Sequence, residues 1–262
     1  MSRVATRLGA FALLLLGTFA TAYAVGEKLP GHAHGAVGHT HDGMDMGTPV
    51  PAGFENGGYQ LVTEGIQAGV ATFHLNDADG KAVTDFTEAH GAILHTVVIR
   101  PDLSDFNHVH PTVGPDGSWS VDLPAPGPWH IVFDSMPASS SASIVVAANL
   151  DDEVPVATVA LPPPDDTVDV DGLAVTRTGF NFAVTAANGG AATGLEPFLG
   201  QPAHLVAIRQ GDLAYTHLHP SGDMSGMFMF GGGIAQPGTY RLFLQFGHNG
   251  QVLTVAFTVV VP

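Results

Sequence analysis

The segment HTVVIRPDLSDFNHVHP, residues 95–111, recurs as HLVAIRQGDLAYTHLHP, residues 204–220. A shift of 109 residues superposes residues 73–111 on residues 182–220 without a gap, and 13 of the 39 paired positions are identical. Composition alone would make about one position in fifteen identical, so the match indicates that the chain contains two copies of one domain.

Both copies are patterned as short strands separated by turns rather than as helices. Turn signals such as Asp116-Gly117 and Asn249-Gly250 lie between apolar segments, and no long amphipathic helix competes with them. About 90 residues and several strands per copy predict an all-β protein with two tandem immunoglobulin-like or cupredoxin-like β-sandwich domains. The expected boundaries are residues 59–148 for the first repeat, 149–166 for a Pro/Asp-rich linker and 167–262 for the second repeat. Strands are expected at residues 96–100, 119–123, 129–133, 205–208, 240–246 and 252–261.

A hairpin in the second repeat predicts that three histidines lie together. Gly211-Asp212 has the Gly-first pattern of a two-residue type II′ turn, and centring the hairpin there places His204 opposite His219. Opposed residues of antiparallel strands share a face, as do residues two apart on one strand, so His217 joins them. Directly opposed Cβ atoms are about 5 Å apart, which is close enough for two rings to reach one ion.

The first repeat predicts the same cluster around Asp102-Leu103, which brings together His95, His108 and His110. We expect each cluster at the end of the core-facing side of its sheet, where the sandwich meets solvent. Three imidazoles without a competing thiol predict a preorganised metal site with an open coordination position, once in each repeat. The alternative is structural: hydrogen bonds to loop carbonyls could hold a His-x-His-Pro strand end, and a duplication would preserve that feature.

The remaining histidines and methionines of the repeats carry weaker signals. Four histidines are each expected to be ordinary surface or capping residues: His74, His90, His130 and His248. Of these, His90 and His248 are the best outside candidates for a fourth ligand. Alternating methionines pack in cores more often than they ligate metals, and we expect this of Met224, Met227 and Met229.

The N-terminal residues 1–25 predict export from the cytoplasm. Arg3 and Arg7 precede an uncharged apolar run at residues 8–25, and Ala22-Tyr23-Ala24 is a plausible cleavage site. The run is either a cleaved secretory signal or a membrane anchor helix, since it is just long enough to span a bilayer. Both interpretations place the rest of the chain outside the cytoplasm, either secreted or tethered at the cell surface with the membrane as a partner.

Residues 26–58 are expected to form a disordered stalk that collects metal ions. Residues 31–47, GHAHGAVGHTHDGMDMG, show no strand or helix periodicity and cannot bury a face. Imidazole and thioether groups are metal donors, and thioethers favour Cu(I). The alternative is a polar spacer of biased composition. The six expected donors of the stalk are His32, His34, His39, His41, Met44 and Met46.

Composition excludes several classes of function. The chain has 8 Lys and Arg against 24 Asp and Glu, a formal net charge of −16, so we expect no nucleic-acid partner. It has no cysteine, which excludes disulfides, thiolate zinc sites, iron–sulfur clusters and thiol nucleophiles.

The chain resembles a group of bacterial exported proteins that have an N-terminal anchor, a His-rich stalk and duplicated β-domains. Three pieces carry the resemblance: residues 95–111, residues 195–220 and residues 237–250. The second piece is the segment at residues 204–220 extended upstream by LEPFLGQPA, and the third is PGTYRLFLQFGHNG. Such proteins are usually described as secreted or heavy-metal-binding. The resemblance implies metal handling outside the cytoplasm, with copper as the first expectation.

These observations predict an extracytoplasmic metal-binding protein that captures, buffers or delivers an ion, copper first and zinc second. Only neutral imidazole coordinates, so binding should weaken below about pH 6. Two alternatives remain open: a non-metal cell-surface interaction module, whose protein partner the sequence does not identify, and a copper-dependent redox enzyme. The chain lacks a G-x-S-x-G elbow and an H-E-x-x-H helix, so we do not expect an enzyme.

Overall fold

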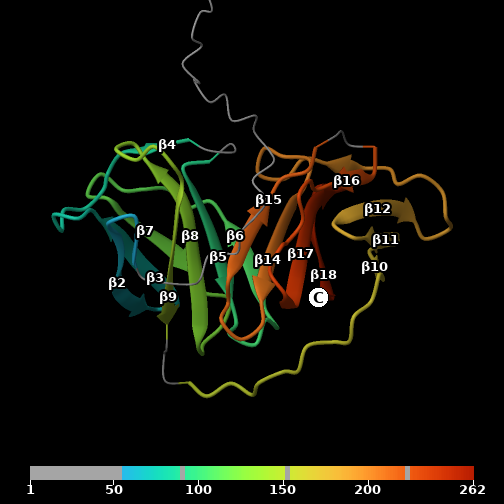
Figure 1. The fold of residues 1–262 in the computed structure, drawn as a ribbon, viewed down its shortest axis with the longest axis horizontal. Coiled ribbons are helices and arrows are strands. Elements are labelled where there is room, and N and C mark those ends of the chain that lie inside the picture. The colour runs from blue at the N-terminus through green and yellow to red at the C-terminus, as the bar shows by residue number, and fades with distance from the viewer. Residues whose placement is uncertain (1–54, 89–91, 151–153, 222–224) are drawn as a thin grey trace, which may run out of the picture. The chain divides into compact units, whose positions relative to one another are not determined.

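The computed structural model describes residues 55–88, 92–150, 154–221 and 225–262. Within these ranges the regular secondary structure is entirely β (Figure 1), and no helix there could span a membrane. The expected anchor and nearly all of the expected stalk lie outside the described residues. The stalk was expected to extend to residue 58, and this boundary is wrong. Glu55 and Asn56 form strand β1 (Glu55–Asn56), which pairs with Gln60 and Tyr59. Gly57 and Gly58, both with positive φ, make the turn.

The first repeat is a sandwich of two antiparallel sheets. One sheet has the order β1-β2-β3-β7, and the other has the order β4-β8-β5-β6 with β9 paired to β8. Apolar residues of both sheets, including Phe73, Trp119 and Phe133, pack into one core between them. The strands that follow β1 are β2 (Tyr59–Gln67), β3 (Val70–Asn76), β4 (Phe86–Thr87), β5 (Leu94–Ile99), β6 (Phe106–Val109), β7 (Ser118–Asp122), β8 (Trp129–Pro137) and β9 (Ile144–Leu150).

The second repeat has the same two-sheet arrangement. Its sheets have the orders β10-β11-β12-β16 and β13-β17-β14-β15, with β18 paired to β17. Phe182, Phe228 and Phe257 belong to its separate core. The strands are β10 (Thr167–Val170), β11 (Leu173–Thr178), β12 (Asn181–Ala186), β13 (Leu195–Glu196), β14 (His204–Arg209), β15 (Tyr215–Leu218), β16 (Met227–Met229), β17 (Gly238–His248) and β18 (Gln251–Val261).

The internal repeat predicted from the sequence is confirmed, and its fine geometry is duplicated as well. Gly117 and Gly226 occupy equivalent positions with φ of +85° and +88°. A Cβ at either position would lie within 2.8 Å of a carbonyl oxygen, so each position requires glycine. The carbonyl belongs to Val83 in the first repeat and to Val184, which is not its equivalent, in the second. Each of the six expected strands overlaps an observed one.

The predicted register of the two histidine hairpins is also confirmed. Val206 pairs with His217 and Val97 pairs with His108, as the centred turns require. The expected two-residue type II′ turn is wrong, because the N–H of Arg209 bonds to the carbonyl of Ala214 at 2.9 Å and leaves a four-residue loop, 210–213. A four-residue loop has the same centre as the expected turn, so the register is unchanged.

From the sequence, the histidines were expected on the core-facing side of each sandwich. This expectation is wrong, because they lie on the opposite face of the sheet. All six residues of β5 are buried, because one face covers the core of the first repeat and the other packs against the second repeat. Val97 and Ile99 pack with Val206 and Ile208 in a third apolar cluster that joins the two repeats. The rings of Phe106 and Phe243 stack within it, with centroids 4.1 Å apart.

Candidate metal centre

Six histidines from the two repeats gather where the five-stranded sheets face each other. The ring of His217 lies 4.9 Å from that of His95 and 4.9 Å from that of His108, centroid to centroid. The two expected clusters are therefore not separate from each other. The predicted clusters do form, but their shared face lies in the interface, so they merge into one six-histidine cluster. Its members are His95, His108 and His110 of the first repeat and His204, His217 and His219 of the second.

In the second repeat, two ring nitrogens approach a third. His204 Nδ1 lies 3.0 Å from His217 Nε2 and 3.1 Å from His219 Nε2. A tetrahedral ion with metal–nitrogen bonds of about 2.0–2.1 Å holds its ligand nitrogens about 3.3 Å apart. The two distances to His204 Nδ1 would need to lengthen by only a few tenths of an ångström for these nitrogens to share one ion.

The carbonyl of Phe198 determines which nitrogen of His204 faces this point. His204 Nε2 lies 2.9 Å from the Phe198 oxygen, and a carbonyl can only accept a hydrogen bond, so Nε2 carries the hydrogen. In the neutral ring Nδ1 then carries the lone pair that is directed at His217 and His219. Metal-binding histidines commonly have this arrangement, in which a backbone oxygen fixes the tautomer and the ring orientation.

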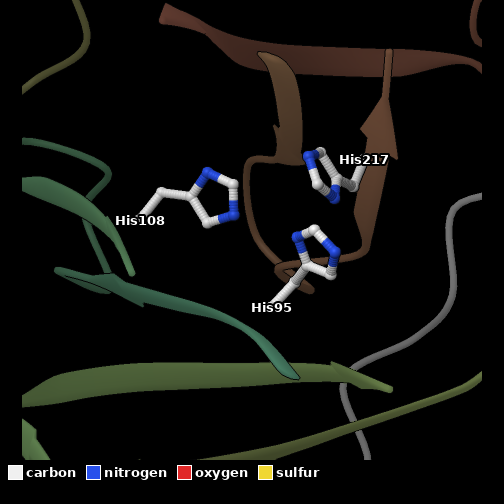
Figure 2. Close-up of side chains that lie close together, drawn as sticks. All are labelled: His95, His108 and His217. Carbon is white, nitrogen blue, oxygen red and sulfur yellow. The ribbon is translucent and has the colours of Figure 1, made fainter. Parts of the chain in front are cut away.

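The first repeat contributes a second group that includes a residue of the second repeat. Ligand nitrogens of His95, His108 and His217 all lie within 4.8 Å of one another. Figure 2 shows the three rings facing a common space, with His217 opposite the two residues of the first repeat. His110 is held beside this group, since its Nε2 lies 2.9 Å from His95 Nδ1.

His108 is oriented by a residue of the other repeat. Its Nδ1 donates to Gln245 Oε1 at 3.2 Å, and the Gln245 amide nitrogen donates to Thr254 Oγ1 at 2.9 Å. His108 Nε2 is buried and has no hydrogen-bond partner among the residues that the structure describes. An unpartnered buried nitrogen lone pair is unfavourable, and a bound cation would satisfy it.

Burial and neighbouring rings lower the pKa of three histidines of the cluster. Burial, followed by the neighbouring rings of His204, His95 and His110, holds the pKa of His108 well below its usual value. Burial and the surrounding histidines likewise lower the pKa of His217, and burial with His95 and His204 lowers that of His110 to about 4. Neutral imidazole is the form that binds metals, so these rings are ready to coordinate at neutral pH.

The other histidines that the structure describes bond to partners outside the cluster. His130, expected at the surface, is instead buried, and its Nδ1 bonds to Asn149 Oδ1 at 2.7 Å. His248, a candidate fourth ligand, bonds to Asp171 at 3.3 Å, and His74 bonds to Glu64 at 3.0 Å. The other candidate, His90, and all six stalk donors lie outside the described residues.

The expectation for the methionines is wrong where the structure describes them. Met227 and Met229 are 45% and 46% exposed, because the alternation along β16 turns Phe228 inward and the flanking thioethers outward. Met224 lies outside the described residues.

Sequence reasoning did not find the residues that orient the cluster. Gln245 was not singled out, although it is a polar residue in the middle of the apolar segment LFLQF, residues 242–246, a pattern that marks a buried polar role. Phe198 acts through its backbone carbonyl, and no sequence pattern signals such a role.

A family model matches both repeats, at residues 58–149 and 166–262, under the description "Domain of unknown function (DUF8832)". The chain belongs to the DUF8832 family. No curated protein matches the chain in sequence. Among solved structures, the crystal structure of the chicken CNTN1 FN1–FN3 domains is similar over 82% of this chain and 69% of that one, with 10% sequence identity and a TM-score of 0.20. The duplicated match assigns one DUF8832 domain to each repeat, so the six-histidine cluster lies between two domains of the same family.

Proposed function

We propose that the chain is an extracytoplasmic metal-binding protein that captures, buffers or delivers an ion, copper first and zinc second. The observation that carries the proposal is the approach of His217 Nε2 and His219 Nε2 to His204 Nδ1, at 3.0 and 3.1 Å, with the His204 tautomer fixed by the Phe198 carbonyl. All donors are imidazoles, which suit Cu(II) and Zn(II).

A neutral hydrogen-bonded cluster would satisfy these nitrogens poorly. His204 Nδ1 has one in-plane lone pair, whereas two ring nitrogens lie within hydrogen-bonding distance of it. Protonation would supply more donors, but a lowered pKa opposes it for His217. A divalent cation accepts all three lone pairs at once, so the donor arrangement favours a metal ion over a purely structural network.

The proposal also includes the type of β-sandwich and the position of the protein outside the cytoplasm. Two packed sheets in a repeat of about 90 residues suit an immunoglobulin-like or cupredoxin-like sandwich. The apolar N-terminal run and the resemblance to exported heavy-metal-binding proteins support a position at the cell surface or in the secreted fraction. The stalk at residues 26–54 would then collect ions and pass them to the cluster.

Metal titration tests the proposal when the stalk donors are removed from the full-length chain. We define the stalk-silent protein as the variant in which His32, His34, His39, His41, Met44 and Met46 are replaced by alanine. Competition titrations with chelators should show Cu(II) and Zn(II) binding that survives in this variant.

Two further variants assign the binding to the cluster. His219→Gln should weaken Cu(II) or Zn(II) affinity at least about tenfold, because it removes one of three ligands. The matched control is His130→Gln, since His130 is a buried, hydrogen-bonded histidine outside the cluster. The metal affinity of this variant should equal that of the stalk-silent protein. Absence of binding in the stalk-silent protein, or equal affinity of both variants, would overturn the proposal.

A further inference from the structure

The two groups of ligand nitrogens have one residue in common. His204, His217 and His219 form one group, and His95, His108 and His217 form the other. The other donors of the two groups belong to different repeats. The five side chains fall into these two groups rather than into one, when the ligand nitrogens of a group must all lie within 4.8 Å of one another, so they surround two centres.

His217 has one nitrogen available for each group. Its Nε2 is directed at His204 Nδ1, at 3.0 Å. An imidazole ring has its second nitrogen on the other side, and Figure 2 shows a nitrogen of His217 on the side of the His95 ring. The His217 ring centroid is 4.9 Å from that of His95.

The second group has a donor that is prepared for an ion. Within the described part of the chain, His108 Nε2 is buried without a hydrogen-bond partner, while its Nδ1 is fixed by Gln245. The ring therefore presents a lone pair toward the space that Figure 2 shows between His95, His108 and His217. This observation is independent of the three-nitrogen contact around His204.

We propose that the cluster binds two metal ions, one in each group, and that His217 bridges them as an imidazolate. This inference rests on the proposed metal-binding function. Each ion forms one bond to a different ring nitrogen of His217, the remaining N–H bond breaks, and its proton passes to water. With metal–nitrogen bonds of about 2 Å, a bridging ring holds its two ions roughly 6 Å apart.

The bridge also connects the repeats. The second ion takes His95 and His108 from the first repeat and His217 from the second, so it would hold the two domains together across their apolar interface. Binding of that ion is thereby coupled to docking of the repeats, because neither repeat alone supplies the three ligands.

Cu(II) titration of the stalk-silent protein at pH 8, followed by electron paramagnetic resonance, tests the inference. We expect two equivalents of tightly bound Cu(II) per chain. The signal should rise with the first equivalent and fall as the second is added, because imidazolate-bridged Cu(II) ions couple antiferromagnetically. His95→Ala should bind one equivalent and retain its full uncoupled signal, and His108→Gln provides a second test of the same loss. His130→Gln, the matched control, should keep two coupled ions.

The outcomes separate this inference from the function on which it rests. A single equivalent in the stalk-silent protein, or two equivalents whose signals add without coupling, would overturn the bridged pair and leave the metal-binding function intact. Absence of any binding would overturn both. Unchanged stoichiometry in folded His95→Ala and His108→Gln, verified by circular dichroism, would also overturn the assignment of the second ion.

Discussion

His108 of the first repeat donates its Nδ1 hydrogen to Gln245 Oε1 of the second repeat, at 3.2 Å and away from solvent. The two residues are 137 positions apart in the chain. This bond fixes the His108 tautomer from across the interface and leaves Nε2 available as a ligand. The geometry of the candidate centre therefore depends on both repeats.

Gln245→Leu should weaken binding of the ion assigned to His108 about tenfold, since loss of a residue that orients a ligand typically has this effect. Chelator competition in the stalk-silent protein measures it. The matched control is Thr258→Val, which removes a buried hydroxyl that accepts a hydrogen bond from Arg241 outside the cluster. Equal affinities for the two variants would contradict an orienting role for Gln245.

The metal-free protein should lose stability as the pH falls from about 6.5 to 4. Burial and the neighbouring His95 and His204 lower the pKa of His110 from 6.5 to about 4, so in this range the unfolded chain binds a proton that the folded state does not. The stabilising contribution is present above the unfolded pKa and is lost as the pH falls through the folded pKa. His110→Asn should flatten part of this decline. Urea unfolding at pH 7, 6, 5 and 4 with chelator checks it, and parallel curves for both proteins would refute it.

The sequence was sufficient to predict the repeat, the strands and the hairpin register. Two similar segments, residues 95–111 and 204–220, locate the duplication. The register follows because the residue numbers of opposed positions around a turn have a constant sum. The pairing of Val97 with His108 and of Val206 with His217 needed only the turn centre, which is why an incorrect turn type did no harm.

The sequence could not predict what the histidine face contacts. An apolar face on a strand looks the same whether it covers its own core or another domain. Val97 and Val206 therefore gave no sign that they meet each other across the repeats. The sharing of His217 between two groups and the bond from His108 to Gln245 both arise from domain docking, a long-range property that local periodicity does not encode.

Phe243→Ala should destabilise the protein by about 3 kcal/mol, because it opens a cavity in the apolar interface between the repeats. Phe243 is 3% exposed, and its ring stacks on Phe106. Urea unfolding measures the change. Val260→Ala is the control, since Val260 is 64% exposed, and it should change stability by less than about 0.5 kcal/mol. A Phe243→Ala loss below about 1 kcal/mol would show that the repeats are not held together by this cluster.

Asp134→Asn should stabilise the metal-free protein at pH 8 and have little effect near pH 4. Asp134 pairs with His95 as Gln245 pairs with His204, so a carboxyl replaces the amide of the second repeat in the same face. Burial raises the pKa of Asp134 to about 7 from 3.8, so the folded state keeps a proton that the unfolded chain releases between these values. Its contribution to stability therefore falls as the pH rises through this window.

Asparagine is neutral at every pH and should remove that loss, as urea unfolding at pH 4, 6 and 8 would reveal. Asp122→Asn, on the exposed side of β7, should change stability by less than about 0.5 kcal/mol at each pH. A gain for Asp134→Asn that is equal at pH 4 and pH 8 would exclude titration of Asp134 as its cause.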